Sequence, residues 1–129
     1  WWLRAARTNE RVRAGWLLRL PRSRKPSREK NMTAYLVANY DVVDVDAYRS
    51  YQKQSRPIMA GGGNLLVLDA ASVGKEGAPR AQTVVIEYPT KDAALAAYES
   101  DDYQAVVGIR LGAVENGRAV IVDGFVMPS

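Results

Sequence analysis

The chain has 129 residues, 47% of them hydrophobic, and contains neither cysteine nor histidine. This length fits one domain. The missing residue types exclude disulfides, thiolate nucleophiles, Cys/His zinc sites and a histidine haem ligand. They also remove the commonest general base near neutral pH. We therefore expect no metal and no cofactor, and the lack of disulfides is compatible with the cytoplasmic location that we expect.

The net charge of +4 is divided unevenly along the chain. Residues 1–31 contain 10 Lys and Arg against 2 Asp and Glu, whereas residues 32–129 contain 8 against 12. The basic isoelectric point therefore comes from the N-terminal segment, and the rest of the chain is mildly acidic. This division gives no support for a nucleic-acid partner. No apolar run is long enough to span a bilayer, so we expect no membrane partner either.

The basic segment at 1–31 is rich in arginine and ends in Pro, Ser, Arg and Lys. Its composition is compatible with a nucleic-acid arm, an amphipathic helix on a membrane surface or a transit peptide. The fourth interpretation is an upstream stretch attached to a domain that begins at Met32. We favour the fourth because the composition changes abruptly there. We predict a disordered or non-native extension at 1–31 and one domain at 32–129.

Apolar runs and turn residues predict the elements of this domain in chain order. The expected order is a strand at 33–40, a helix capped by Asp44 or Asp46 and running to about residue 59, a strand at 64–68, a polar connection at 69–80, a strand at 83–88, a helix capped by Thr90, a second helix capped by Ser100 and running to about residue 114, and a strand at 119–123. This β-α-β-β-α-β order, with the second helical region split, is typical of the α+β ferredoxin-like fold with a four-stranded antiparallel sheet.

Glycine and proline define the expected ends of several elements. Pro57 should kink or end the first helix. The triple glycine at 61–63 follows a helix and precedes a strand, which is typical of a helix C-terminal cap. A phosphate-binding loop would instead lie between a strand and the start of a helix. Asn116 and Gly117 indicate a turn before the last strand.

The strands are apolar at almost every position, as in TVVIEY at 83–88, NLLVL at 64–68 and AVIVD at 119–123. A sheet with one solvated face would alternate apolar and polar residues. One layer of helices covers only one face, and a body of this size has no further layer to offer. A second copy of the sheet is the simplest cover, so the sequence predicts a face-to-face homodimer.

Four stretches of the body resemble a known bacterial family. They are AYLVANYDVVDVDAYRSY at 34–51, GGG at 61–63, VVIEYPTKDAALAAYESDDYQ at 84–104 and AVIVDG at 119–124. Residues 32–125 resemble the domain-of-unknown-function family 1330, DUF1330, of the dimeric α/β-barrel superfamily. The resemblance implies a ferredoxin-like fold and a dimer whose two sheets form a barrel, and it implies little about activity.

One difference from that family limits what the resemblance carries over. Its members usually have an arginine near the end of the second strand, where this chain has Leu68 and Asp69. An anion-binding role of that arginine is therefore not expected here.

The residues with catalytic chemistry are few. Glu87 comes first, because it lies in an apolar strand on the same side as Val85 and opposite Ile86. A carboxylate on a buried sheet needs a polar partner, so Glu87 is a candidate general base or polar anchor; the alternatives are a structural ion pair and a solvated strand end. Arg110 interrupts the apolar face of the last helix and is suited to a ligand carboxylate. Its alternative is a stem along the core with the guanidinium in water.

Tyr40 completes the catalytic candidates, because a tyrosine hydroxyl can orient a substrate or act as an acid. Asn39 and Asp41, at the end of the first strand, and Tyr103, on the last helix, are the predicted ligand-binding residues. For each tyrosine the alternative is a packed ring with a hydrogen-bonded hydroxyl. The acidic residues near the helix starts are better explained as caps than as metal ligands.

Three hypotheses for function follow. The first is a small dimeric protein that binds an apolar or weakly acidic metabolite between sheet and helices. The second is a cofactor-free enzyme, an isomerase or a monooxygenase-like protein, that uses Glu87, Tyr40 or Arg110, as the superfamily resemblance permits. The third is a structural dimer without a pocket. A cavity lined by Glu87 and a tyrosine would favour the second hypothesis, and a solid core would favour the third.

Overall fold

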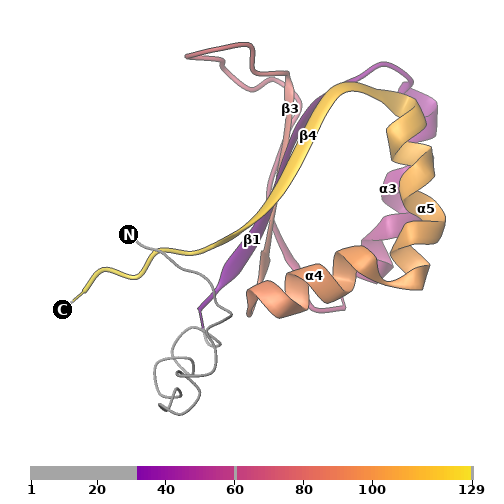
Figure 1. Cartoon of the computed structure of the whole chain (residues 1–129). Coiled ribbons are helices and arrows are strands. Elements are labelled where there is room, and N and C mark those ends of the chain that lie inside the picture. Colours follow the sequence, from indigo (N-terminus) through magenta and orange to yellow (C-terminus); the bar gives the residue numbers. More distant parts are fainter. Residues whose placement is uncertain (1–31, 60, 129) are drawn as a thin grey trace, which may run out of the picture. The chain divides into compact units, whose positions relative to one another are not determined.

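The computed structural model describes residues 32–59 and 61–128, in which strands and helices follow the predicted order (Figure 1). The elements are β1 (Ala34–Val42), α3 (Val45–Met59), β2 (Asn64–Asp69), β3 (Gln82–Tyr88), α4 (Lys91–Glu99), α5 (Asp101–Ala113) and β4 (Val114–Asp123). The extension predicted at 1–31 lies outside the described residues and stays a prediction.

A side-chain oxygen begins each helix, as the sequence predicts. The Asp44 carboxylate accepts the backbone N–H of Ala47 at 3.0 Å, which selects Asp44 over Asp46 as the cap of α3. The Thr90 hydroxyl accepts the N–H of residue 93 at 3.0 Å, and the Ser100 hydroxyl accepts the N–H of Tyr103 at 3.2 Å. Each cap pairs a backbone donor that has no partner within its own helix. Ser100 therefore separates α4 from α5 without a loop.

Helix α3 ends at the predicted residue, so Pro57 does not end it, and a kink at Pro57 stays a prediction. Pro57 lies inside the helix, which continues to Met59. The glycines then close the helix: the Gly61 N–H donates to the Ile58 carbonyl at 3.3 Å, and the Gly63 N–H donates to the Met59 carbonyl at 2.9 Å. The triple glycine is therefore a helix-ending turn, as predicted.

The four strands form one antiparallel sheet in the order β2-β3-β1-β4, with α3, α4 and α5 on the same face (Figure 1). On the helix-covered face, register pairs Leu36 with Ile86 and with Ile121. Leu36 and Ile86 are buried there, together with rings from the strands and helices. The main core therefore lies between the sheet and the helices.

The other face of the sheet, here called the open face, carries a row of valines across all four strands. Register places Val67 beside Val85, Val85 beside Val37, and Val37 beside Val120. No described helix covers this row (Figure 1), and Val120 is 54% exposed. The prediction that both faces of the sheet are apolar is thus confirmed.

The last strand begins earlier than predicted. β4 starts at Val114, and Asn116 lies within it at φ 55°, where the pairing with β1 shifts register between Asn39 and Asp41. The prediction of a turn at Asn116 and Gly117 was therefore wrong. Some bulges and some tight turns share a residue in the left-handed backbone conformation, which asparagine tolerates better than most residues.

A methyl group at Gly63 should destabilise the fold. A Cβ atom there would lie 2.6 Å from the Met59 carbonyl oxygen and 2.8 Å from the Ile86 Cγ2 atom. Such overpacking usually costs about 1–3 kcal/mol, so Gly63→Ala should lower the thermal midpoint by several degrees. Gly62→Ala is the matched control, because a Cβ atom at Gly62 meets nothing within 4 Å. Equal midpoints for the two variants in a thermal melt would contradict this packing.

Candidate functional site: a cavity lined by tyrosines

A cavity of about 130 Å³ lies between α3 and the helix-covered face of the sheet. Helix α3 contributes Tyr48, Tyr51, Gln52, Ser55, Arg56 and Met59 to its lining. The sheet contributes Tyr40, Leu65, Leu68, Val84 and Ile86, and Gly63 completes the wall. Most of this surface is aromatic or aliphatic, and none of these lining residues is an acid.

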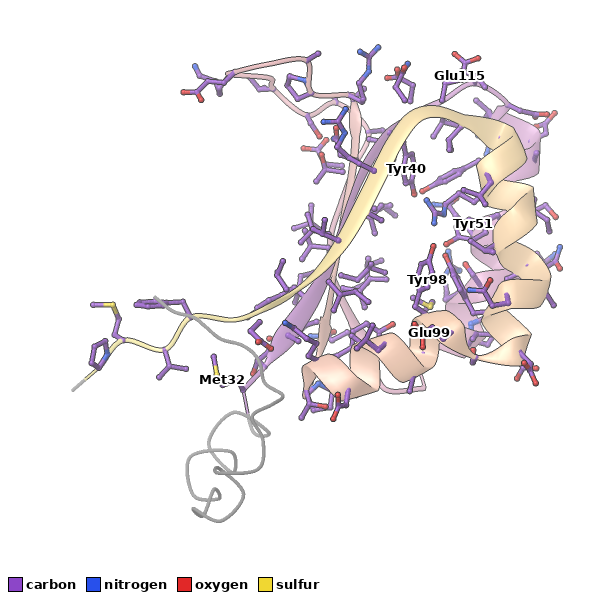
Figure 2. The ribbon with its side chains drawn as sticks, in the orientation of Figure 1. Met32, Tyr40, Tyr51, Tyr98, Glu99 and Glu115 are labelled. Carbon is purple, nitrogen blue, oxygen red and sulfur yellow. The ribbon has the colours of Figure 1, made fainter. Side chains whose placement is uncertain are left out.

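Differences in exposure among the lining residues distinguish the end of the cavity that is open to solvent from the end that is buried. Arg56, Leu65 and Leu68 are exposed and mark its mouth. Tyr40 and Tyr48 are buried at the far end, here called the base. Figure 2 shows Tyr40 on β1 and Tyr51 on α3 in the space between sheet and helices. A ligand that entered at Arg56 would therefore meet aliphatic walls first and tyrosine rings last.

The tyrosines of the base are joined in hydrogen-bonded pairs. The hydroxyl oxygens of Tyr40 and Tyr48 are 2.7 Å apart, and those of Tyr51 and Tyr103 are 2.6 Å apart. The rings of Tyr40 and Tyr48 meet edge to face, with centroids 5.8 Å apart. Buried tyrosine hydroxyls normally have such partners. The two pairs hold strand β1 and helices α3 and α5 together at the base.

Arg110 lies behind these rings and is buried. It is 5% exposed, and its Nε atom has no hydrogen-bond partner. Its guanidinium carbon lies 5.3 Å from the ring centroid of Tyr40 and 5.7 Å from that of Tyr51, which are cation–π distances. Among the described residues, no carboxylate forms an ion pair with it. The alternative of a guanidinium in water was therefore wrong, because tyrosine rings enclose it.

The site has one buried positive charge at neutral pH, that of Arg110. Burial raises the pKa of Tyr40 and of Tyr103 far above the ordinary value, although the nearby Arg110 guanidinium opposes this rise. Burial also raises the pKa of Tyr48. Burial by itself lowers the pKa of Arg110, but the neighbouring Tyr103 and Tyr51 raise this pKa by more than burial lowers it. The guanidinium therefore stays protonated. The hydroxyls are thus neutral while the arginine is charged.

The predicted site residues divide between the two faces of the sheet. Tyr40, Tyr103 and Arg110 are brought together on the helix-covered face. Glu87 is paired with Tyr35 on the open face, where the Asn64 side chain approaches its carboxylate at 3.5 Å. Within one protomer the sheet separates Glu87 from Tyr40 and Arg110. The cavity therefore has tyrosines but not the predicted glutamate, and the catalytic roles of these residues stay predictions.

Asn39 and Asp41 are engaged elsewhere in the protein, at the end of β1. The Asn39 amide nitrogen donates to the Arg80 carbonyl at 2.9 Å, and its oxygen accepts the Arg80 N–H at 2.7 Å. The Asp41 carboxylate pairs with the Arg80 guanidinium at 2.7 Å and accepts the Asn116 amide at 3.2 Å. The Asn116 hydrogen bond and the Arg80 guanidinium lower the pKa of Asp41. These contacts hold the β2–β3 connection in place, and a ligand-binding role of Asn39 and Asp41 stays a prediction.

Sequence reasoning missed the aliphatic half of the cavity. Leu65, Leu68 and Ile86 line it, but within the sequence they appear only as strand residues. On α3, Tyr48, Tyr51 and Ser55 follow one another at helical spacing, which is typical of one inward face. That spacing could not distinguish a filled interface from one with a cavity.

Comparison with protein families gives one decisive match. The family model described as "Domain of unknown function (DUF1330)" matches residues 33–125. This chain belongs to the DUF1330 family. The resemblance to that family at 32–125 is thereby confirmed. A comparison with curated proteins finds no match for this DUF1330 chain.

Solved structures share the fold of this DUF1330 protein at low identity. A protein of unknown function from Rhodopseudomonas palustris is 16% identical, with a TM-score of 0.64 over 79% of this chain and 89% of its own. A hypothetical Arabidopsis thaliana protein is 9% identical, with a TM-score of 0.59 over 78% and 96%. A dimeric ferredoxin-like protein of unknown function from Thermobifida fusca is 16% identical, with a TM-score of 0.53 over 74% and 93%. The predicted α+β ferredoxin-like fold with a four-stranded antiparallel sheet is confirmed.

In the described part of the DUF1330 chain, no helix is long and apolar enough to cross a membrane. The acidic side chains of the same part form no group of three or more that could hold a metal ion.

The buried tyrosines predict how stability depends on alkaline pH. Folding raises the pKa of Tyr40, Tyr48, Tyr88 and Tyr103 above the ordinary value of about 10, so the unfolded chain loses these protons first as the pH rises. Their contribution to the unfolding free energy should be complete below about pH 10 and be lost above it. We expect near-ultraviolet tyrosinate absorbance from these residues to rise together with loss of circular dichroism. Ionisation of all tyrosines while the dichroism stays native would contradict their burial.

Proposed function

We propose that this DUF1330 protein is a homodimer in which each protomer binds a small apolar or weakly acidic metabolite in the tyrosine-lined cavity. The observation that carries the binding proposal is a cavity with aromatic and aliphatic walls. Two of its lining tyrosines, Tyr40 and Tyr51, contact the buried guanidinium of Arg110, which has no carboxylate partner among the described residues. Ligand pockets typically combine an apolar lining with a few polar groups that orient the ligand. A buried charge without a partner is costly and commonly belongs to a functional site.

The valine row supports the dimer. It crosses all four strands on the open face, and no described helix packs against it. Contiguous apolar surface of this kind usually marks an interaction site. The Thermobifida fusca protein with the same fold is described as dimeric. A second copy of this sheet, with the same row, is a self-complementary cover of the kind that two-fold symmetry requires.

The cavity supports binding and does not extend the proposal to catalysis. Its lining contains no carboxylate and the chain contains no histidine, so the usual general bases are missing from the lining itself. The same cavity argues against the hypothesis of a dimer without a pocket. Of the three hypotheses, metabolite binding is therefore the best supported.

A lysine on the open face should dissociate the dimer. Val85 lies on the open face, so Val85→Lys should halve the molar mass measured by light scattering while circular dichroism stays native. Ile86 is buried in the core, so Ile86→Lys should instead unfold the protein. Leu111→Lys is the control for an added charge, because Leu111 is exposed on α5. A wild-type monomer at micromolar concentration would contradict the dimer.

Filling the mouth of the cavity should abolish ligand binding. Leu68 lines the cavity and is 48% exposed, so Leu68→Trp adds a large ring there at little cost to folding. Saturation-transfer NMR with benzyl alcohol, benzoate and isovalerate should give signals with the wild type that are lost in Leu68→Trp. Leu111→Trp adds the same ring away from the lining and should keep the signals. Signals from none of these compounds with the wild type would refute the binding proposal.

A further inference from the structure

The tyrosine hydroxyl groups at the base of the cavity have more protons to donate than there are hydrogen-bond acceptors beside them. Tyr40 and Tyr48 share one hydrogen bond, so one of their two hydroxyl protons is left over, whichever residue donates. Both residues line the cavity, so the spare proton belongs to a lining side chain in either case. Tyr51 and Tyr103 form a second pair with the same surplus. No further acceptor within hydrogen-bonding distance of these hydroxyls is found in the described part of the chain.

Arg110 adds a positive charge directly behind the same hydroxyl groups. Its guanidinium contacts the rings of Tyr40 and Tyr51 but is not part of the lining, and its Nε–H is a further donor without an acceptor. The base therefore presents only neutral hydroxyls and one cation. Negative charge placed at the hydroxyls would gain attraction from Arg110 in a region sheltered from water.

A carboxylate is the chemical group that best matches these hydrogen-bond donors without acceptors. It has no donor, it offers two oxygens that each accept more than one hydrogen bond, and its charge would offset that of Arg110. An amide would use one end as an acceptor but would bring further donors. An ammonium group would bring donors and a like charge, so the base selects against it.

The volume restricts the rest of the ligand. A cavity of about 150 Å³ in another protein holds benzene, and this cavity measures about 130 Å³. One six-membered ring or one short branched chain fits such a space, with Leu65, Leu68 and Ile86 against it. Nucleotides and cofactors of drug size need several hundred Å³.

We propose that the cavity selects small aromatic or branched-chain monocarboxylates, with the carboxylate bound at the base by tyrosine hydroxyls and the apolar group toward the mouth. In this arrangement Tyr48 is a direct ligand contact, and Arg110 is a positioning residue that acts through the rings of Tyr40 and Tyr51. This inference rests on the proposed function, because it names the chemical class of the metabolite. It adds the orientation of the ligand in the cavity and a preference for a negatively charged ligand over a neutral one.

Matched acid and amide pairs test the preference for charge. The full-length protein is titrated by calorimetry with benzoate and benzamide, and with isovalerate and isovaleramide, which differ little in shape. We expect each acid to bind at least about tenfold more tightly than its amide, which corresponds to about 1.4 kcal/mol. Benzylamine should not bind. Equal affinities for acid and amide would overturn the carboxylate inference while leaving metabolite binding intact. No binding of any compound would overturn both.

Variants of the base show which groups produce that preference. Tyr48→Phe keeps the ring and removes the hydroxyl, so the ratio of acid to amide affinity should fall toward one while amide binding stays unchanged. Arg110→Gln should lower the same ratio, and Arg110→Lys should restore part of it by restoring the charge. Arg49→Gln, at an exposed position of α3 outside the lining, is the control and should leave the ratio unchanged. If Arg110→Gln fails to fold, Tyr48→Phe decides the question. A ratio that Tyr48→Phe leaves unchanged would overturn the proposed contact.

Discussion

Helices can cover only one face of this sheet, and much of the rest of the structure depends on that constraint. The first helical connection leads from β1 over β3 to β2, and the second leads from β3 over β1 to β4. Strand direction and crossing direction are both reversed in the second connection, so the same right-handed rule places both on one face. Leu36, Tyr40 and Ile86 on that face are buried in the core together with side chains of the helices. The valine row on the opposite face has no described cover, although its composition is that of a core.

Sequence patterns predicted most of the fold because its signals are local. Thr90, Ser100 and the triple glycine act on backbone groups within a few residues, so their roles follow from order along the chain. Asn116 was mistaken for a turn residue, because asparagine favours the left-handed conformation that occurs both in some turns and in some strand irregularities. Distinguishing the two requires the partner strand, which no single segment reveals.

The site was harder to predict, because it depends on which face of the sheet the helices cover. Alternation correctly placed Glu87 on the side of Val85, but did not say that Tyr40 and Arg110 lie on the opposite side. The alternative considered for Arg110 was a guanidinium in water, as is usual for long side chains on helices. Instead, four tyrosines from β1, α3 and α5 converge around it, and that convergence depends on tertiary packing. The cavity exists because the side chains of α3 and of the sheet do not fill the space between them. No pattern within the sequence predicts such incomplete packing.

The hydrogen bonds and the ion pair that join Asn39 and Asp41 to Arg80 have a consequence for how the chain can evolve. The connection between β2 and β3 is tied near both of its ends: the Ser72 N–H donates to the Ala81 carbonyl at 2.9 Å, and the Ser72 and Thr83 hydroxyls are 2.6 Å apart. The closure entropy of a flexible loop grows only slowly with its length, so added residues between these ties would cost little. The segment at 73–79 is therefore a place where the chain can accept insertions, or a foreign peptide, without disturbing the sheet.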